Sequence, residues 1–190
     1  MSGFRYGKDG FVMTDFMNML EQRSSCRSYA DRPVEDKKIV SCINAARFSP
    51  SAMNSQPWHF YVANDPDSAA FISSNVQIGN MNGWTGRVPA FVLVTQESAE
   101  AIKTLPFSAR RDFRQFDIGM AVHAFLLEAA QEGLGACVIG LMDEEKLKQR
   151  FRISSEKKIA LILAVGYPAD DWKPGAKKRK ELGELVTYVK

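Results

Sequence analysis

The segment Arg23–Tyr29 reads RSSCRSY and places two arginines four residues apart with hydroxyl side chains between them. A guanidinium is a permanently charged planar fork that binds a phosphate through two parallel hydrogen bonds. Arg23 and Arg27, with Ser24 and Ser25, therefore have the composition of a phosphate clamp. Taken alone, the pair fits the solvated end of a helix better, because surface arginines usually remain in water.

A second polar stretch, Phe48–Phe60, reads FSPSAMNSQPWHF. Its two prolines lack backbone donors and disfavour helix and sheet, and its short polar side chains bond nearby backbone groups. A helix is therefore predicted to end near Arg47 and a strand to begin near His59, with a loop between them. The loop offers hydroxyls, an amide and free N–H groups to a flat polar ligand, although its composition equally fits a tight connector.

Residues 50–58, PSAMNSQPW, resemble the P-S-[SA]-x-N-x-Q-P-W signature of the nitroreductase family. Arg23–Tyr29 is similar to the R-x-S-x-[RK]-x-[FY] opening of that family, and Leu134–Gly140 to the end of its long central helix and the strand after it. The resemblance implies an α+β nitroreductase-like fold with a central mixed β-sheet flanked by helices. It also implies that the long central helix lies at a homodimer interface.

The resemblance further implies that flavin mononucleotide (FMN) is the cofactor and lies between the two subunits. The backbone N–H of Gly140 is implied to face the flavin N5 atom, and no side chain is implied as catalytic, because the flavin carries the redox chemistry. Arg179 is the preferred phosphate ligand of the basic tail, ahead of Lys178. The implied cofactor-binding residues are Arg23, Ser24, Ser25, Arg27, Pro50, Ser51, Ala52, Asn54, Ile139, Gly140, Lys178 and Arg179.

The stretch Thr104–Gln115, TLPFSARRDFRQ, mixes aromatic and cationic residues. One interpretation is a flap that turns Phe107 and Phe113 toward a substrate and Arg110 toward its anionic groups. The other interpretation, equally weighted, is a basic surface turn that leads into a helix.

Hydrophobic periodicity and end signals predict most of the regular structure. The expected helices are Asp15–Gln22 after the N-cap Thr14, Glu35–Arg47, Pro66–Ile78, Phe116–Gly133 and Asp143–Phe151. The expected strands are His59–Ala63, Pro89–Thr95, Cys137–Gly140, Lys158–Val165 and a C-terminal edge strand, Leu185–Val189.

With 190 residues, 45% of them hydrophobic, the chain is expected to form one domain, 1–190, with an N-terminal arm, 1–13, and a C-terminal extension, 170–190. The two histidines and three cysteines do not fall at metal-ligand spacing, so no metal site is expected. Free thiols without a C-x-x-C pair indicate the cytoplasm. No apolar run is long enough to span a membrane. The net charge of +3 is too small to indicate nucleic acid.

The expected function is that of an FMN-dependent oxidoreductase working by a ping-pong mechanism. Hydride would pass from NADH or NADPH through flavin N5 to an electron-poor acceptor, such as a nitroaromatic or a quinone. A flavin-binding or flavin-modifying protein, or a reductive dehalogenase of the iodotyrosine-deiodinase type, remains open within the same superfamily. The remote alternative is a nucleic-acid-binding module that uses the basic run Lys177–Lys180 together with Arg110, Arg111 and Arg114.

Overall fold

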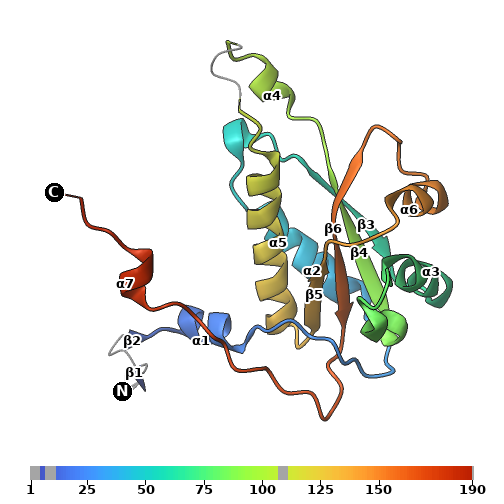
Figure 1. The fold of residues 1–190 in the computed structure, drawn as a ribbon, viewed down its shortest axis with the longest axis horizontal. Coiled ribbons are helices and arrows are strands. Elements are labelled where there is room, and N and C mark those ends of the chain that lie inside the picture. Colours follow the sequence, from blue (N-terminus) through green and yellow to red (C-terminus); the bar gives the residue numbers. More distant parts are fainter. Residues whose placement is uncertain (1–4, 7–11, 107–110, 190) are drawn as a thin grey trace.

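The computed structural model describes residues 5–6, 12–106 and 111–189 (Figure 1). Its regular elements in the first half of the chain are β1 Arg5–Tyr6, β2 Val12–Met13, α1 Asp15–Gln22, α2 Asp36–Arg47, the 3₁₀ turn η1 Ala52–Asn54, β3 Trp58–Ala63, α3 Pro66–Val76, the 3₁₀ turn η2 Gly83–Arg87 and β4 Ala90–Gln96. The second half contains α4 Glu100–Lys103, α5 Arg114–Gln131, β5 Gly135–Ile139, α6 Glu144–Phe151, β6 Lys158–Gly166 and α7 Leu182–Leu185.

Four strands form the central sheet in the order β3-β4-β6-β5, and all three pairings between them are antiparallel. The sequence predicts a mixed sheet, and this prediction is wrong for the four described strands. Parallel pairing is limited, within the described residues, to a single bridge between Ser25 and Ala136 beside the sheet. Continuous apolar strands such as β4 are typical of parallel sheets, because helices cover both faces there. Here helices cover both faces of an antiparallel sheet, so the apolar pattern does not reveal strand direction.

Figure 1 shows α2 and α5 on one face of the sheet and α3 and α6 on the other. The central strand β4 serves both layers because its side chains alternate between the two faces. Phe91 and Leu93 pack in the cluster on the α3/α6 side, and Val92 and Val94 pack in the cluster on the α2/α5 side. This double core fixes the edge strand β5 and the N-terminal end of α5, which carry the candidate site.

The predicted starts of α1 and α3 are confirmed by their caps. The hydroxyl of Thr14 accepts a hydrogen bond from Met17 N (3.2 Å), and Asp65 accepts one from Ser68 N (2.9 Å). The longest helix, α5, begins two residues earlier than predicted, because the Asp112 carboxylate accepts from Arg114 N (3.1 Å) and extends the first turn.

Both ends of the chain run away from the sheet on the same side (Figure 1). Within the predicted arm, β1 and β2 pair as an antiparallel hairpin, and the other residues of 1–11 lie outside the described residues. The predicted edge strand Leu185–Val189 does not form in the single chain. The last part of the tail instead contains α7, closed by a reciprocal capping box between Glu181 and Glu184.

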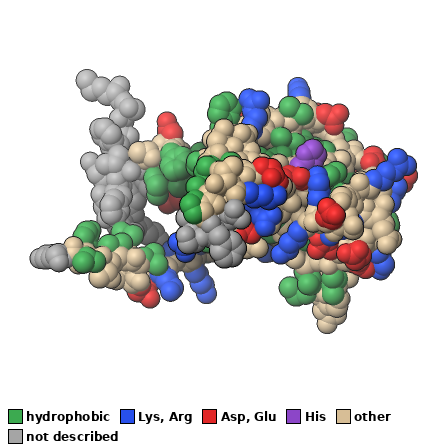
Figure 2. Space-filling model, turned by 90° about the horizontal axis from the view of Figure 1, so that it is seen from above, with side chains coloured by type: hydrophobic (Ala, Val, Ile, Leu, Met, Phe, Trp, Pro, Cys, Tyr) green, Lys and Arg blue, Asp and Glu red, His purple; other side chains and the backbone are tan. Residues whose placement is uncertain are grey.

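On the face shown in Figure 2, Lys and Arg side chains are interspersed with Asp and Glu side chains, in keeping with the small net charge of +3. Across the described ranges, no helix combines the length and the apolar character that crossing a bilayer demands. In the same ranges, no three His, Cys, Asp or Glu side chains are grouped so as to hold a metal ion.

Candidate functional site

The segment that follows α1 lies against the free edge of β5. Cys26 N donates to the carbonyl of Ala136 (3.2 Å), and Ser25 forms the parallel bridge with the same residue. A Cβ atom at Gly135 would lie 2.6 Å from Cys26 Cβ, so glycine is required there for the two backbones to approach. This contact fixes the residues of the predicted phosphate clamp beside the first residues of β5.

The basic tail returns to the same place through Lys177. Its Nζ atom donates to the carbonyls of Leu20 (2.5 Å) and Arg23 (2.6 Å), which end α1. Burial lowers the pKa of Lys177, and the neighbouring charges of Arg23 and Arg179 lower it further, while Glu21 opposes them. Three cations from opposite ends of the sequence therefore lie close enough to repel one another, and a bound anion would relieve that repulsion.

The second arginine of the clamp belongs to the same group. Burial raises the pKa of the Cys137 thiol on β5, and the charges of Arg27 and Arg23 act in the opposite direction, so both guanidinium groups are near this strand. Arg27 is exposed and forms no ion pair within the described part of the chain. We call Arg23, Arg27, Lys177 and Arg179 the cationic cluster; its donor set fits a phosphate group.

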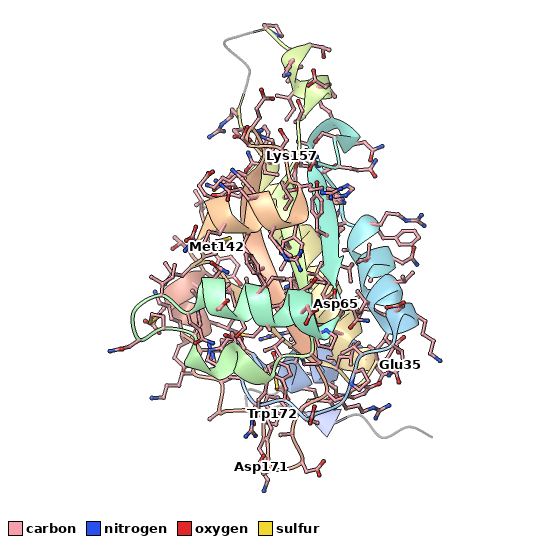
Figure 3. All side chains as sticks on the ribbon, turned by 90° about the vertical axis from the view of Figure 1, so that its right-hand side faces the viewer. Glu35, Asp65, Met142, Lys157, Asp171 and Trp172 are labelled. Carbon is pink, nitrogen blue, oxygen red and sulfur yellow. The ribbon has the colours of Figure 1, made fainter. Side chains whose placement is uncertain are left out.

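A cavity of about 180 Å³ adjoins the cluster. Arg23 and Ser24 line this cavity together with Ala130 at the end of α5 and Trp172 from the C-terminal extension. Figure 3 shows Trp172 near the lower end of the molecule, opposite Lys157 at the other end of the sheet. The cationic cluster therefore occupies the end of the sheet at which β5 begins.

The loop with the Pro-Ser-Ala-x-Asn sequence is held at the other end of α5. Ala52 N donates to both carboxylate oxygens of the buried Asp117 (3.2 and 3.3 Å). Ser51 Oγ accepts from Gln56 N (2.9 Å), and the Gln56 amide donates to Asn54 Oδ1 (3.2 Å). These contacts make the loop a fixed element rather than a loose connector.

The loop also carries backbone strain. Met53 and Asn54 have φ angles of 52° and 53°, in the left-handed region that L residues rarely adopt. Asn tolerates this conformation better than other side chains, so the strain falls on Met53 and on Gln56, whose φ angle is 44°. Pro50 and Asn54 are both exposed and available to a ligand.

Gly140 follows the last residue of β5 and is exposed. A Cβ built on it would meet no atom within 4 Å, so open space lies beside its backbone. The neighbouring Ile139 buries its side chain in the core and offers only backbone to a ligand. Gly140 and Gly135 are separated by about 16 Å along the extended strand.

The structure brings some predicted residues together and leaves others apart. Arg23 and Arg27 lie beside the start of β5, and Gly140 lies at its end. The loop with Asn54 is bound to Asp117, about 20 Å along α5 from Ala130, at 1.5 Å per residue. One chain therefore does not enclose the cationic cluster and the loop in one cavity.

Comparison with known proteins identifies the family of this arrangement. The sequence profile described as "Nitroreductase family" matches residues 20–167. The chain belongs to the nitroreductase family. The family assignment and the α+β fold expected from the sequence are therefore confirmed.

Individual relatives are consistent with this family. An NADH dehydrogenase/NAD(P)H nitroreductase from Archaeoglobus fulgidus, so named, is 28% identical over 84% of this chain and 88% of its own length. An iodotyrosine deiodinase from Thermotoga neapolitana is 26% identical over 90% of this chain and 97% of its own length. An FMN-dependent nitroreductase from Clostridium difficile R20291 superposes with a TM-score of 0.73 at 20% identity, over 90% of this chain and 96% of that chain.

In this nitroreductase-family chain, the structure describes Phe113 but not the other two residues predicted to face a substrate. Phe107 and Arg110 lie outside the described residues. Phe113 is the N-cap of α5, is half-buried, and lines a cavity of about 540 Å³ with Arg111, Asp112 and Phe116.

Sequence reasoning missed two residues that organise the candidate site. The sequence places Asp117 only within the predicted helix Phe116–Gly133, although a buried carboxylate needs a donor partner. The sequence predicts Lys178 and Arg179, and not Lys177, as the phosphate ligands of the tail, whereas in the structure the Lys178 carbonyl accepts a hydrogen bond from Arg179 (2.8 Å). The available signals were the acidic-x-Gly start of α5 for Asp117 and the leading cation of the basic run for Lys177.

Proposed function

We propose that this protein is an FMN-dependent oxidoreductase that moves hydride from NADH or NADPH to an electron-poor acceptor, such as a nitroaromatic or a quinone. The observation that carries the proposal is the geometry of β5. Four cations gather where this strand begins, and an exposed glycine with open space beside it follows where the strand ends. Bound FMN would supply the site at which a hydride is accepted and then passed on.

Each group has a proposed role in holding the cofactor. Arg23, Arg27 and Arg179 would neutralise the phosphate through charge-assisted hydrogen bonds. Ser24 and Ser25 would bond the polar chain between the phosphate and the ring. The backbone N–H of Gly140 would be directed at N5, where the absence of a side chain permits close approach. Lys177 would hold Arg23 in place rather than bind the cofactor.

The remaining residues are proposed to come from a second copy of the chain. Pro50, Ser51, Ala52 and Asn54 are distant from the cationic cluster within one chain, so a homodimer with FMN between its subunits would complete the site. Exposed apolar side chains on α5, Phe116 and Met120, support burial of that helix against a partner. The three cysteines, all free and buried, are in keeping with a cytoplasmic location.

The test is reconstitution followed by turnover. Purified protein incubated with FMN is expected to acquire the flavin absorption spectrum, and the loaded protein is expected to oxidise NADH or NADPH when a nitroaromatic or quinone is added. Protein that stays colourless and binds no FMN would contradict the proposal. FMN binding without nicotinamide oxidation would favour a flavin-binding or flavin-modifying function.

Reductive dehalogenation is the second candidate. It is favoured by the iodotyrosine deiodinase relative, which aligns over 97% of its own length and therefore has no large additional segment. Release of iodide from iodotyrosine by the reduced, FMN-loaded protein would support this function. Absence of iodide release alongside rapid nitroaromatic reduction would exclude it.

A further inference from the structure

A cavity of about 340 Å³ lies between the first turns of α5 and the start of β6. Strand β5 is shorter than β6 and ends at Ile139, which pairs with Ile162. Gly140 and Leu161 each lie one residue beyond this last pair, so they are neighbours where β5 leaves the sheet. Leu161 lines the cavity, which therefore lies at the end of the sheet at which β5 ends.

A β-bulge shapes one wall of this cavity. Thr95 pairs with Ile159 and Val94 pairs with Leu161, so Ala160 has no partner on β4. Bulges redirect side chains and are frequent beside active sites. Ala160 and Gly119 line the cavity with small or absent side chains, which leaves space for a flat ligand.

The polar groups of the cavity are hydrogen-bond donors. Lys158 is exposed and has no ion-pair partner among the described residues. The charge of Lys158 acts on the nearby Glu144, but the Glu144 carboxylate pairs with Lys148 (2.9 Å) and accepts a hydrogen bond from Ile159 N (2.8 Å). In the amide orientation that satisfies both its oxygen and its nitrogen, the Gln96 oxygen accepts from Arg114 (3.1 Å), so the polar group that remains on this side chain is a donor, the NH₂.

Gln115 adds a second carboxamide, and Ile118 and Leu161 supply aliphatic surface. An ammonium and amide donors complement a planar group that only accepts hydrogen bonds, and the aliphatic surface complements an aromatic ring. A carboxylate has this character, and its negative charge would give Lys158 an ion-pair partner. The cavity volume lies within the range of small-molecule sites, about 300–1,000 Å³.

We propose that this cavity selects aromatic acceptors that bear a carboxylate, and that Lys158 is the specificity-determining residue. The identification of the bound molecule as an acceptor rests on the proposed oxidoreductase function, whereas the preference for a carboxylate rests on the cavity alone. The two parts are therefore separable by experiment.

The experiment compares 4-nitrobenzoate with 4-nitrobenzamide, a neutral analogue of nearly the same shape. Binding of each compound to FMN-incubated protein is measured by calorimetry, and turnover with NADH or NADPH is measured in parallel. The variants are Lys158→Gln, Lys158→Arg as a charge-conserving rescue, and Lys37→Gln as a control that removes one exposed charge from α2. Thermal melting checks that every variant is folded.

Lys158→Gln is expected to weaken 4-nitrobenzoate binding about tenfold, as for loss of one partly solvated charge pair, and to leave 4-nitrobenzamide unchanged. Lys158→Arg is expected to retain most of the preference, and Lys37→Gln all of it. Equal affinity of the wild type for both compounds, or equal loss for both in Lys158→Gln, would overturn the inference. A binding preference without nicotinamide oxidation would instead refute the oxidoreductase function and retain the carboxylate site.

Discussion

At the scale of single residues, the two glycines of β5 lack side chains for different reasons. Gly135 is packed against Cys26, where a Cβ would be 2.6 Å from another carbon, whereas Gly140 borders open space. The first glycine is a packing requirement, and the second matters only if something else approaches its backbone. Substitution can therefore separate structure from function.

We expect Gly140→Ala to change the free energy of unfolding of the cofactor-free protein by less than about 0.5 kcal/mol, since the new methyl group contacts nothing. FMN affinity or nicotinamide oxidation should nevertheless fall, because the methyl group obstructs close approach. Gly135→Ala should be destabilised by about 1–3 kcal/mol through overpacking. Denaturant unfolding and FMN titration of both variants provide the measurement; unimpaired FMN binding and turnover in Gly140→Ala would contradict its role.

Lys177 provides a second prediction at this scale. Lys177→Met removes the ammonium that binds the Leu20 and Arg23 carbonyls, so Arg23 loses its fixed position. FMN binding is expected to weaken about tenfold, in line with loss of one to two charge-assisted hydrogen bonds. Lys180→Met, which removes an exposed charge from the same basic run, is the control. Equal effects of the two changes on FMN titration would show that only net charge matters.

At the scale of elements, the helices and strands could be predicted from local sequence patterns, whereas the direction in which the strands pair could not. Ile118, Val122 and Phe125 recur at helical spacing, and all are buried, so α5 was predictable. The direction of β4 was not predictable, because a strand buried on both faces has the same composition in either direction. The Ala52–Asp117 contact joins residues 65 positions apart, and no local propensity encodes it.

The Asp117 carboxylate gives a prediction for the loop that contains Asn54. In Asp117→Ala the Ala52 N–H loses its acceptor, which is expected to reduce the free energy of unfolding by about 1–3 kcal/mol. Asp117→Asn retains one acceptor oxygen and should lose less. Denaturant unfolding measures both changes, and identical stability of Asp117→Ala and the wild type would refute a structural role for this contact.

The contact between β6 and the start of α2 predicts a pH dependence. The Tyr167 hydroxyl donates to Glu35 Oε2 (2.5 Å) and holds the pKa of that carboxyl at about 2, below its usual value of 4.5. A lowered pKa stabilises the fold above pH 4.5, and the contribution is lost as the pH falls through about 2. The melting temperature of Tyr167→Phe should therefore be below that of the wild type at pH 7, with a difference that shrinks between pH 4.5 and 2. A difference independent of pH would indicate lost packing alone.

At the scale of the whole molecule, the candidate site is divided between the two ends of α5, and the proposed function places a second subunit there. Met120→Glu places a charge on the exposed apolar face of that helix and is expected to give a folded monomer that binds FMN weakly. Val62→Glu changes an equally apolar, exposed position on β3 and is the matched control. Sedimentation and FMN titration report both properties. A Met120→Glu dimer with normal FMN affinity would exclude this face as the interface.

The tether between Lys177 and the end of α1 also sets an order of events during synthesis. The ammonium contacts a carbonyl 157 positions earlier in the chain, so this contact cannot form until nearly the whole polypeptide has left the ribosome. The sheet is complete at Gly166 and does not need this contact. A released chain that ends at residue 170 should therefore be compact yet bind FMN more weakly than the whole chain, because it lacks Lys177 and Arg179, and a shortened product would be folded without being a competent flavin carrier.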